Sequence, residues 1–591
     1  MESWPPTSTE LFLDRSAVRA NLEKTRALLE RRGLDALVVT SADSHLNEYT
    51  PRADNQRYFL SGFTGSTALM LVPRVGRAKL FVDGRYHIQA DLQVDPADVE
   101  VVKVPLSNYI SAALYDAAKA FAKVGYAPDR VSKAMEEALK GAAKDATPLE
   151  PGELDQTIGI AEPAHTKPLS VIPPGISGRS IKQKLEAVFA TIAEPEKTVL
   201  LLTALDDIAW MTDARGYHFA YQSSFAARGF AVKDAVHVAL APALLERHRP
   251  PAVESVHWHV EPIEALLARS EYDAVTTVLY DSGATTAAVL RRLAAARPNW
   301  TLVAQSSPVV AVRAVKTPEE LRHLEAINER SSRAVANTIR WVRRQLATGA
   351  RVSETGFYEA ANGYYAAEGA RDLSFHTISS IGADTAIIHF SEPKDDVVAT
   401  PDDLMLLDSG ALYEGGLSTD ITRAFLAGGR RGQAAAKAKE IYTLTLKGLL
   451  NAATAIFPSG TRGSFLDALA RQPLYQGGYD FAHGTGHGVG IHVHEPGVSL
   501  GPTSTLAIKA GHVSSIEPGI YLGGFGGVRL ENVYVYEPVP ERPGFLRPRA
   551  LNFVAFDRSL IDESILEPRE RAALEAYMAE CVRRGTDYND A

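Results

Sequence analysis

The sequence predicts two related α/β domains followed by an α+β domain. A helix-and-strand pattern occurs twice in the first half, a strong helix start lies near residue 317, and the last part places strands between two helix pairs. At 591 residues the chain is long enough for two to four domains of ordinary size. Its 46% hydrophobic and 23% charged residues are typical of a soluble globular protein.

The repeated pattern is a helix, a buried strand, a polar turn, a glycine-bearing loop and a second strand. Its first copy runs from the helix LEKTRALLERRG (22–33) through LDALVVT and SADSHLNEY to TALMLV. Its second copy runs from IKQKLEAVFATI (181–192) through TVLLLTALDDIAWM and TDARG to GFAVKDAVHVAL. The copies are about 165 residues apart. We therefore predict α/β domains over residues 1–160 and 161–308.

The third domain, predicted over residues 309–591, opens with a capped helix. Thr317 is the expected N-cap, Pro318 occupies the first helical position, and Glu320 completes a capping box. The strands expected after two helices are LMLLDSGALY, STDITRAFLA, HVSSIEPGIYL and GGVRLENVYVYE. A second helix pair, around GQAAAKAKEIYTLTLKGLLNAA and GSFLDALARQPLY, separates these strands into two groups. Strands flanked by helix pairs indicate an α+β domain.

Composition and charge argue against several classes of protein. The net charge of −9 is small for this length, and no block of like charge stands out, so a nucleic-acid or membrane-surface role gains no support. The N-terminus lacks an apolar core of signal-peptide length, and no run of about 18 apolar residues predicts a membrane span. Cys581 is the only cysteine, which excludes an intrachain disulfide and fits the reducing cytoplasm. We expect a cytoplasmic protein.

Four carboxylates lie in or beside apolar strands: Asp408, Asp420, Glu517 and Glu531. A buried, unpaired carboxylate costs several kcal/mol, so a group of them with few basic neighbours indicates bound cations. Structural ion pairs are the alternative, because Arg423 and Arg529 could neutralise two of the four.

A glycine-rich stretch, FAHGTGHGVGIHVHEPG (481–497), adds His483, His487, His492 and His494. His492 and His494 would share a face only if this stretch were an extended strand. Four carboxylates with one histidine form an oxygen-dominated ligand set. Such a set suits Mn²⁺ and is unlike a zinc site built from thiolates.

Several ordered motifs resemble one known superfamily. They are SGFTGS (61–66), VDGRY (82–86), ALDDIAWMTDARG (204–216), LSFHTISS with AIIHF (373–390), DSGALYEGGLSTDITR (408–423), HGTGHGVGIHVHE (483–495), SIEPGIY (515–521) and RLEN (529–532). The chain resembles the pita-bread metallopeptidases, which include creatinase, prolidase and methionine aminopeptidase. Within them it looks most like the three-domain aminopeptidase P type. The resemblance covers nearly the whole chain and implies two creatinase-like N-terminal domains before a pita-bread catalytic domain.

The resemblance implies a role for each site residue. The implied metal ligands are Asp408, Asp420, His487, Glu517 and Glu531, with Asp420 and Glu531 bridging two divalent ions, Mn²⁺ being favoured over Zn²⁺ or Co²⁺. The implied catalytic residues are His389, His483, His494, Glu517 and Arg529. Arg529 matches a basic residue beside the ligands. His492 has no counterpart and is interpreted as structural.

The sequence departs from the family pattern in three places. Asp408 and Asp420 lie twelve positions apart where the family usually has eleven, and we expect the turn between them to absorb the surplus. His376 stands where relatives often have proline. The ending RALNFVAFDRSLID follows the family only loosely, so no contact is carried over from it.

The implied reaction is removal of an N-terminal residue that precedes proline, by attack of a metal-bridging hydroxide. In it Glu517 would handle the proton of the water, His389 and His494 would donate hydrogen bonds to the oxyanion or leaving nitrogen, and His483 would shape the proline pocket. A homodimer is also implied. The alternatives are a prolidase restricted to dipeptides and a non-catalytic interaction protein of the same fold. Relatives of the latter kind lack the metal ligands, which are all present here.

Overall fold

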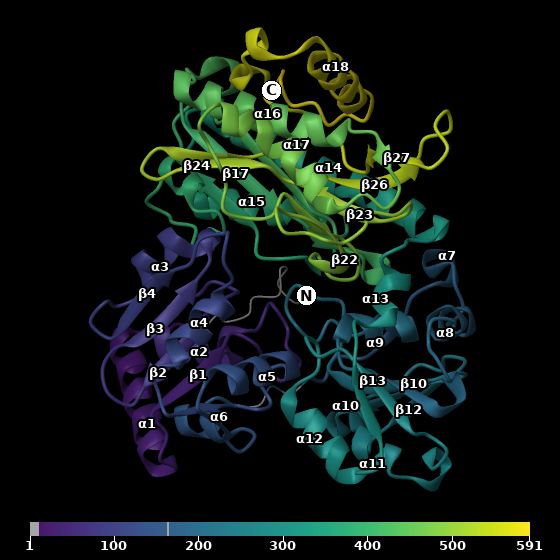
Figure 1. The fold of residues 1–591 in the computed structure, drawn as a ribbon. Helices are drawn as coiled ribbons and strands as arrows, with labels where there is room; N and C mark the ends of the chain where they lie inside the picture. The colour runs from purple at the N-terminus through teal and green to yellow at the C-terminus, as the bar shows by residue number, and fades with distance from the viewer. Residues whose placement is uncertain (1–10, 162, 164, 591) are drawn as a thin grey trace. The chain divides into compact units, whose positions relative to one another are not determined.

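The computed structural model describes residues 11–161, 163 and 165–590 (Figure 1). The first ten residues, part of the segment used to argue against a signal peptide, lie outside this range. The chain divides into two compact units. The N-terminal unit includes 11–172 and Arg179–Val312, and the C-terminal unit includes Pro173–Gly178 and the chain from Arg313 onward. Within the described residues, no helix is both long and apolar enough to cross a membrane.

The first domain of the N-terminal unit is a mixed six-stranded sheet in the order β4-β3-β2-β1-β5-β6. Its strands are β1 (Ala36–Thr40), β2 (Leu69–Pro73), β3 (Ala78–Val82), β4 (Val99–Lys103), β5 (Lys123–Tyr126) and β6 (Asp145–Pro148). Its helices are α1 (Arg15–Arg32), α2 (Gln56–Ser61), α3 (His87–Gln93), α4 (Ile110–Ala118), α5 (Lys133–Ala142) and α6 (Glu153–Ile158). Buried side chains of α1, α2, α3 and α6 form the core on one face of the sheet, and those of α4 and α5 form the core on the other.

The second domain repeats this sheet in the order β12-β11-β10-β8-β13-β14. In both domains the strand that follows the first helix pairs antiparallel to one neighbour and parallel to the other, as β1 does with β2 and β5 and β8 does with β10 and β13. The strands are β8 (Thr198–Leu202), β10 (Ala227–Val232), β11 (Ala235–Leu240), β12 (Val256–His259), β13 (Thr277–Tyr280) and β14 (Thr301–Ala304). The helices are α8 (Ile181–Phe189), α9 (Leu205–Thr212), α10 (Pro242–Arg247), α11 (Ile263–Leu267), α12 (Ala287–Ala296) and α13 (Pro308–Arg313). The prediction of two related α/β domains is confirmed.

Two local features differ from the sequence prediction. The first helix begins at Arg15, seven residues before the predicted start, because the Asp14 side chain accepts a hydrogen bond from the Ala17 N–H at 2.8 Å and caps it. It ends as predicted at Gly33, whose φ of 63° favours glycine. Short helices, α2 and α9, occupy the segments expected to be a loop and part of a strand. At six and eight residues they are too short to display helical periodicity.

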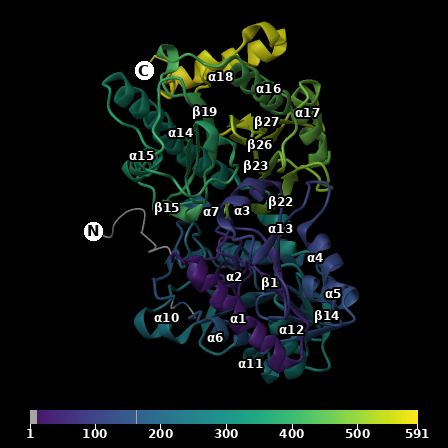
Figure 2. The same cartoon turned by 90° about the vertical axis from the view of Figure 1, so that its left-hand side faces the viewer.

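The C-terminal unit is an α+β domain in which two helix pairs pack against antiparallel sheets, as predicted. Figure 2 shows α14 with α15 and α16 with α17 as separate pairs. The main helices are α14 (Pro318–Ala347), α15 (Glu354–Ala367), α16 (Ala436–Ala453), α17 (Gly463–Gln476) and α18 (Pro568–Arg583). One sheet has the order β16-β17-β19 and a larger one has the order β20-β27-β26-β23-β21-β22.

The strands of these sheets contain the site residues or lie directly beside them in the sequence. They are β16 (Ile378–Ile381), β17 (Leu404–Ser409), β19 (Ile421–Leu426), β20 (Phe457–Pro458), β21 (Gly486–Gly488), β22 (Glu495–Leu500), β23 (Val513–Ile516), β26 (Asn532–Pro538) and β27 (Phe545–Ala550). A hairpin, β24 (Gly519–Leu522) with β25 (Gly526–Arg529), lies between β23 and β26 in the sequence. The remaining short elements are α7 (Pro174–Ser177), β7 (Ser170–Val171), β9 (Ala214–Arg215), β15 (Asp372–Leu373) and β18 (Ala411–Leu412).

The predicted capping box at the start of α14 is present. Thr317 Oγ1 accepts from the Glu320 N–H at 3.0 Å, and the Glu320 side chain accepts from the Thr317 N–H at 2.8 Å. Thr317 Oγ1 also donates to the Ser177 carbonyl oxygen at 3.2 Å. That contact joins α7 to the C-terminal unit, although the sequence analysis placed α7 inside the second α/β domain.

Candidate metal centre

Asp408 and Asp420 face the same side of the small sheet. Asp408 is the fifth residue of β17, and Asp420 immediately precedes β19. In the antiparallel register Asp408 lies opposite Thr422, so their side chains project from the same face. Asp420 is two positions before Thr422 and therefore points the same way. Both aspartates are buried.

The turn between these strands absorbs the extra residue. Gly415 and Gly416 have φ angles of 82° and 68°, which favour glycine. Glu414, the carboxylate of this turn, accepts two hydrogen bonds from Arg330 Nη1 at 2.7 and 2.8 Å. In this turn Glu414 forms an ion pair with Arg330 of α14. The side chains of Asp408 and Asp420 still project from the same face of the sheet.

Glu531 is held beside the same strands by Thr422. The Glu531 N–H donates to the Thr422 carbonyl oxygen at 3.2 Å, and Thr422 Oγ1 donates to Glu531 Oε2 at 2.6 Å. Glu531 lies between β25 and β26 and is 1% exposed. Two carboxylates from one strand region and one from another are therefore gathered in a buried space.

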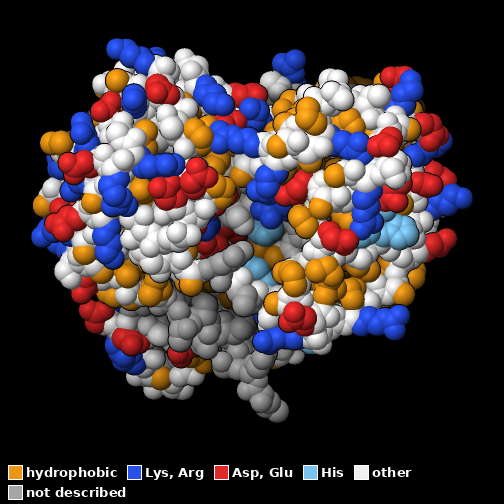
Figure 3. Space-filling model, turned by 90° about the horizontal axis from the view of Figure 1, so that it is seen from below, with side chains coloured by type: hydrophobic (Ala, Val, Ile, Leu, Met, Phe, Trp, Pro, Cys, Tyr) orange, Lys and Arg blue, Asp and Glu red, His pale blue; other side chains and the backbone are white. Residues whose placement is uncertain are grey.

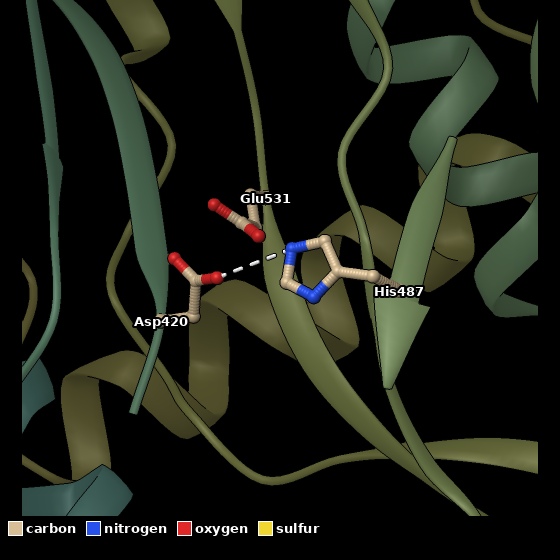
Figure 4. Close-up of side chains that lie close together, drawn as sticks. All are labelled: Asp420, His487 and Glu531. Carbon is tan, nitrogen blue, oxygen red and sulfur yellow. Dashed lines mark ion pairs between the residues drawn. The ribbon is translucent and has the colours of Figure 1, made fainter. Parts of the chain in front are cut away.

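His487 and Glu517 close the cluster from the larger sheet. His487, in β21, has Nε2 at 3.2 Å from Glu517 Oε1 and at 3.5 Å from Asp420 Oδ2. Glu517 follows β23, and its N–H donates to the Thr485 carbonyl oxygen at 2.7 Å. Figure 4 shows Asp420, His487 and Glu531 pointing toward one another, and one ligand atom from each lies within 4.8 Å of the other two.

Arg529 connects Asp408 to two further side chains. Its Nη2 donates to Asp408 Oδ2 at 2.6 Å, and its Nη1 donates to the Tyr521 hydroxyl at 2.8 Å. The Tyr521 hydroxyl also lies 2.9 Å from His483 Nε2. His483 Nδ1 is 3.9 Å from Glu517 Oε2, so this chain of polar groups runs around the carboxylates from Asp408 to Glu517.

The electrostatics of the cluster show an excess of buried negative charge. Burial and then the neighbouring carboxylates raise the pKa of Asp420 well above its usual value and that of Glu531 to about 8. Burial also raises the pKa of Asp408, although Arg529 opposes that shift. One arginine and one histidine therefore do not compensate four carboxylates.

His487 and Glu517 act as an ion pair. Burial would lower the pKa of His487, but the hydrogen bond to Glu517 and the charges of Glu517 and Glu531 raise it to about 9. Burial would raise the pKa of Glu517, but the same hydrogen bond and charge lower it. An imidazole must be neutral to ligate a metal ion, so metal binding here would release this proton.

Two carboxylate oxygens of the cluster have no hydrogen-bond partner among the described residues. They are Asp408 Oδ1 and Glu531 Oε1, and both are buried. A buried carboxylate oxygen without a donor is costly, and a cation removes that cost. The donor set therefore fits divalent metal ions with oxygen-rich coordination.

The other predicted histidines lie in different surroundings. The His494 ring is 4.3 Å from the His487 ring, edge to face, which places it beside the cluster. His492 and His494 lie just before β22 and not in an extended strand, and His492 Nδ1 accepts from the His494 N–H at 3.1 Å. His389 lies in the turn after Ile388, whose carbonyl oxygen accepts from Arg529 at 3.3 Å. His376 stacks on Tyr358 with ring centroids 5.1 Å apart.

Sequence reasoning missed Thr422 and Tyr521. Thr422 could have been found, because strand alternation puts it on the same face as Asp420. Tyr521 could not, because its contact with Arg529 depends on the β24–β25 register, in which Gly519 lies opposite Arg529 and Tyr521 opposite Gly527.

The chain is similar over its whole length to known peptidases. A model of metallopeptidase family M24 matches residues 322–538, and two models of the creatinase/prolidase N-terminal domain match residues 21–155 and 161–320. The chain is 30% identical over 615 residues to a probable Xaa-Pro aminopeptidase P of Colletotrichum graminicola, covering 98% of this chain and 97% of the relative. It is 31% identical over 591 residues to the corresponding protein of Pyricularia oryzae, covering 94% of both.

Solved structures of peptidases share the fold of this chain. The X-prolyl aminopeptidase of Caenorhabditis elegans, described as a cytosolic enzyme with a di-nuclear active site, superposes with a TM-score of 0.84 at 27% identity and covers 96% of both chains. An Xaa-Pro dipeptidase from Bacillus anthracis shares the fold, with a TM-score of 0.53 at 22% identity, over 64% of this chain and 99% of that one. The chain therefore belongs to metallopeptidase family M24, in the group of three-domain aminopeptidase P proteins with two creatinase-like N-terminal domains.

Proposed function

We propose that this chain is an aminopeptidase that releases the first residue from peptides whose second residue is proline. The C-terminal unit would bind two divalent metal ions through Asp408, Asp420, His487, Glu517 and Glu531, the five ligands that the family resemblance implies. The observation that carries the proposal is the cluster of the buried Asp420 and Glu531 with the half-buried His487, beside oxygens of Asp408 and Glu531 that have no hydrogen-bond partner among the described residues. Mn²⁺ is the proposed ion, because four carboxylates and one imidazole suit a hard cation.

Bound metal ions would supply a water of lowered pKa and a polarised carbonyl group. Glu517, which points toward His487, would take the proton of that water. His494, beside His487, and His389 would donate hydrogen bonds to the charge that develops on the substrate. His483 would shape the pocket for the proline ring, held in place by the Tyr521 hydroxyl. Arg529 would fix Asp408 and Tyr521 at once.

The preference for proline has a physical basis. The bond before proline is a tertiary amide without an N–H. A peptidase pocket that accepts a hydrogen bond from that N–H therefore cannot bind such a substrate in the same way. The relatives from Colletotrichum and Pyricularia are named Xaa-Pro aminopeptidases, and the Caenorhabditis enzyme is named an X-prolyl aminopeptidase. These names support the same specificity here. The homodimer and the cytoplasmic location remain predictions.

A set of short peptides tests the proposal. Metal-loaded enzyme should cleave Arg-Pro-Pro after the arginine, should cleave Arg-Ala-Pro far more slowly, and should lose activity on chelation. The free amine of the substrate would lie beside the metal ions, and acetylation removes that amine. Acetylated Arg-Pro-Pro should therefore resist cleavage. Equal rates for Arg-Pro-Pro and Arg-Ala-Pro would remove the proline specificity. Cleavage of Arg-Pro without cleavage of Arg-Pro-Pro would identify a prolidase instead.

A further inference from the structure

Three histidines lie together at one edge of the second creatinase-like domain. His237 is in β11, and His257 and His259 are in the parallel edge strand β12. The register pairs His237 with His257, and His259 is two positions further along, so all three side chains project from the same face. The His237 ring centroid is 4.9 Å from that of His257 and 5.3 Å from that of His259, with the rings nearly parallel.

The nearest pair of ring nitrogens has the separation of two ligands of one ion. His237 Nδ1 and His259 Nε2 are 3.1 Å apart. Two imidazole nitrogens bound to one ion at about 2.0–2.1 Å, at angles from a right angle to tetrahedral, are about 2.9–3.4 Å apart. In the ion-free arrangement one nitrogen donates its proton to the other. A metal ion that replaced this proton would lie off the line between the two nitrogens. The rings would therefore have to rotate slightly to direct both lone pairs at the ion.

His237 is held in place by its surroundings. Its ring stacks on the buried Phe230 at 4.7 Å with an interplanar angle of 8°, and its Nε2 lies 3.4 Å from the Tyr272 hydroxyl. A contact of this kind to the second ring nitrogen orients a metal-binding histidine. Burial lowers the pKa of His237 to about 4 and also lowers that of His259, which is the direction that favours the neutral imidazole.

His257 gives the pair access to solvent and a third ligand. It is exposed, and neither of its ring nitrogens lies within 4.8 Å of both His237 Nδ1 and His259 Nε2, so it would have to change rotamer to reach the same ion. Exposed side chains make such changes within nanoseconds. The neighbouring Arg269 is paired with Glu261 at 2.6 Å, which reduces its repulsion of a cation. Histidine side chains are visible among the charged ones on the face drawn in Figure 3.

We propose that His237, His257 and His259 form a binding site for one divalent transition-metal ion of the Zn²⁺, Cu²⁺ and Ni²⁺ class. Imidazole nitrogens select these ions, whereas the carboxylate-rich cluster of the C-terminal unit suits Mn²⁺. The site shares no residue with that cluster, so it does not depend on the proposed peptidase activity. Ion binding would join the edge strand β12 to β11 and stabilise the folded domain.

The test uses full-length, Mn²⁺-loaded enzyme titrated with Ni²⁺ in isothermal titration calorimetry. Some Ni²⁺ could displace Mn²⁺ from the catalytic centre. In addition to that Ni²⁺, wild type should bind one Ni²⁺ per chain. His259→Ala and His237→Phe, the latter preserving the stack on Phe230, should weaken this event by about tenfold or more. His248→Ala is the matched control, since His248 is a histidine of the same domain that instead contacts the Thr166 carbonyl oxygen at 3.0 Å. It should leave the event unchanged.

Two further readouts separate this site from folding defects and from the catalytic centre. Cu²⁺ bound to wild type should give an electron paramagnetic resonance spectrum with imidazole nitrogen couplings, which His259→Ala loses while its circular dichroism spectrum is unchanged. Asp420→Ala, which alters the proposed catalytic centre, should retain the extra ion. Equal Ni²⁺ affinity in wild type and His259→Ala would overturn the proposal. So would loss of the extra ion in Asp420→Ala, or no extra ion in wild type.

Discussion

Two buried groups of charges in the C-terminal unit are built in opposite ways. In the metal centre, Asp408, Asp420, Glu517 and Glu531 share one arginine and one histidine, and two of their oxygens have no hydrogen-bond partner. Elsewhere in the unit, one carboxylate, Glu495, meets two cations. It pairs with Lys316 and lies 3.4 Å from Arg313 Nε.

The difference separates a binding site from a structural ion pair. The charge of Glu495 is compensated within the protein by Lys316 and Arg313, and its Oε1 also accepts from the Ile491 N–H at 3.2 Å. Glu495 directly follows His494, so this pair fixes the segment that carries a proposed catalytic histidine to the start of the C-terminal unit. The metal centre balances only when cations are added. Neutralising one carboxylate should therefore have opposite effects on stability in the two places.

The largest expected effect is at the shared ligand Asp420. Asp420→Ala should lower turnover of Arg-Pro-Pro by about 10⁴-fold, which corresponds to about 5.5 kcal/mol, because it removes a ligand of both proposed ions. Metal analysis after desalting should show fewer than two ions per chain. In chelator, the isosteric Asp420→Asn should unfold at the same temperature as wild type or higher, because it removes a like charge beside Glu531. Normal metal content in Asp420→Ala would contradict the ligand assignment.

The opposite outcome is expected at Glu495. Glu495→Gln should lower the free energy of unfolding of the C-terminal unit by about 3–5 kcal/mol, because the buried Lys316 would lose the carboxylate with which it pairs. Denaturant unfolding in chelator measures this. Glu414→Gln is the matched control, since its partner Arg330 is partly exposed, and it should cost about 0–1 kcal/mol. Equal losses in the two variants would show that burial does not distinguish these pairs.

A smaller effect separates metal binding from catalysis at His494. His494→Ala should lower turnover by about 10²–10³-fold, or about 2.7–4 kcal/mol, while both ions remain bound, because its proposed hydrogen bond strengthens only in the transition state. His492→Ala tests the structural interpretation of its neighbour and should lower turnover less. Loss of metal from His494→Ala would instead make it part of the ligand shell.

Features that depend on residues close together in the sequence were mostly predicted correctly. The capping box at Thr317 defined the start of α14, and strand alternation explains why Asp408 and Asp420 share a face. The motifs that carried the family resemblance led to the creatinase-like domains and the fold of the C-terminal unit. What the sequence did not reveal depends on contacts between distant segments. The Tyr521–Arg529 contact requires a hairpin register, and the inclusion of Pro173–Gly178 in the C-terminal unit requires packing against α14.

A third kind of buried carboxylate, held by backbone N–H groups, sharpens the contrast. Glu354, at the start of α15, is fully buried and accepts backbone N–H groups of Ile381 at 3.0 Å and Lys394 at 3.1 Å. Burial raises its pKa from 4.5 to about 7. Between these two values the folded protein binds more protons than the unfolded chain, so the free energy of unfolding should fall as pH rises.

Glu354→Gln should remove this dependence at a site where no ion is involved. From pH 4.5 to pH 8 the variant should gain about 3 kcal/mol relative to wild type, with the change concentrated between pH 4.5 and 7. Denaturant unfolding at several pH values measures the difference. Glu359→Gln, on the exposed side of the same helix, is the matched control for loss of one negative charge. If Glu354→Gln and Glu359→Gln show the same pH profile, the backbone donors and the nearby Lys394 already stabilise the charged form of Glu354, and a buried carboxylate needs no metal ion to remain ionised here.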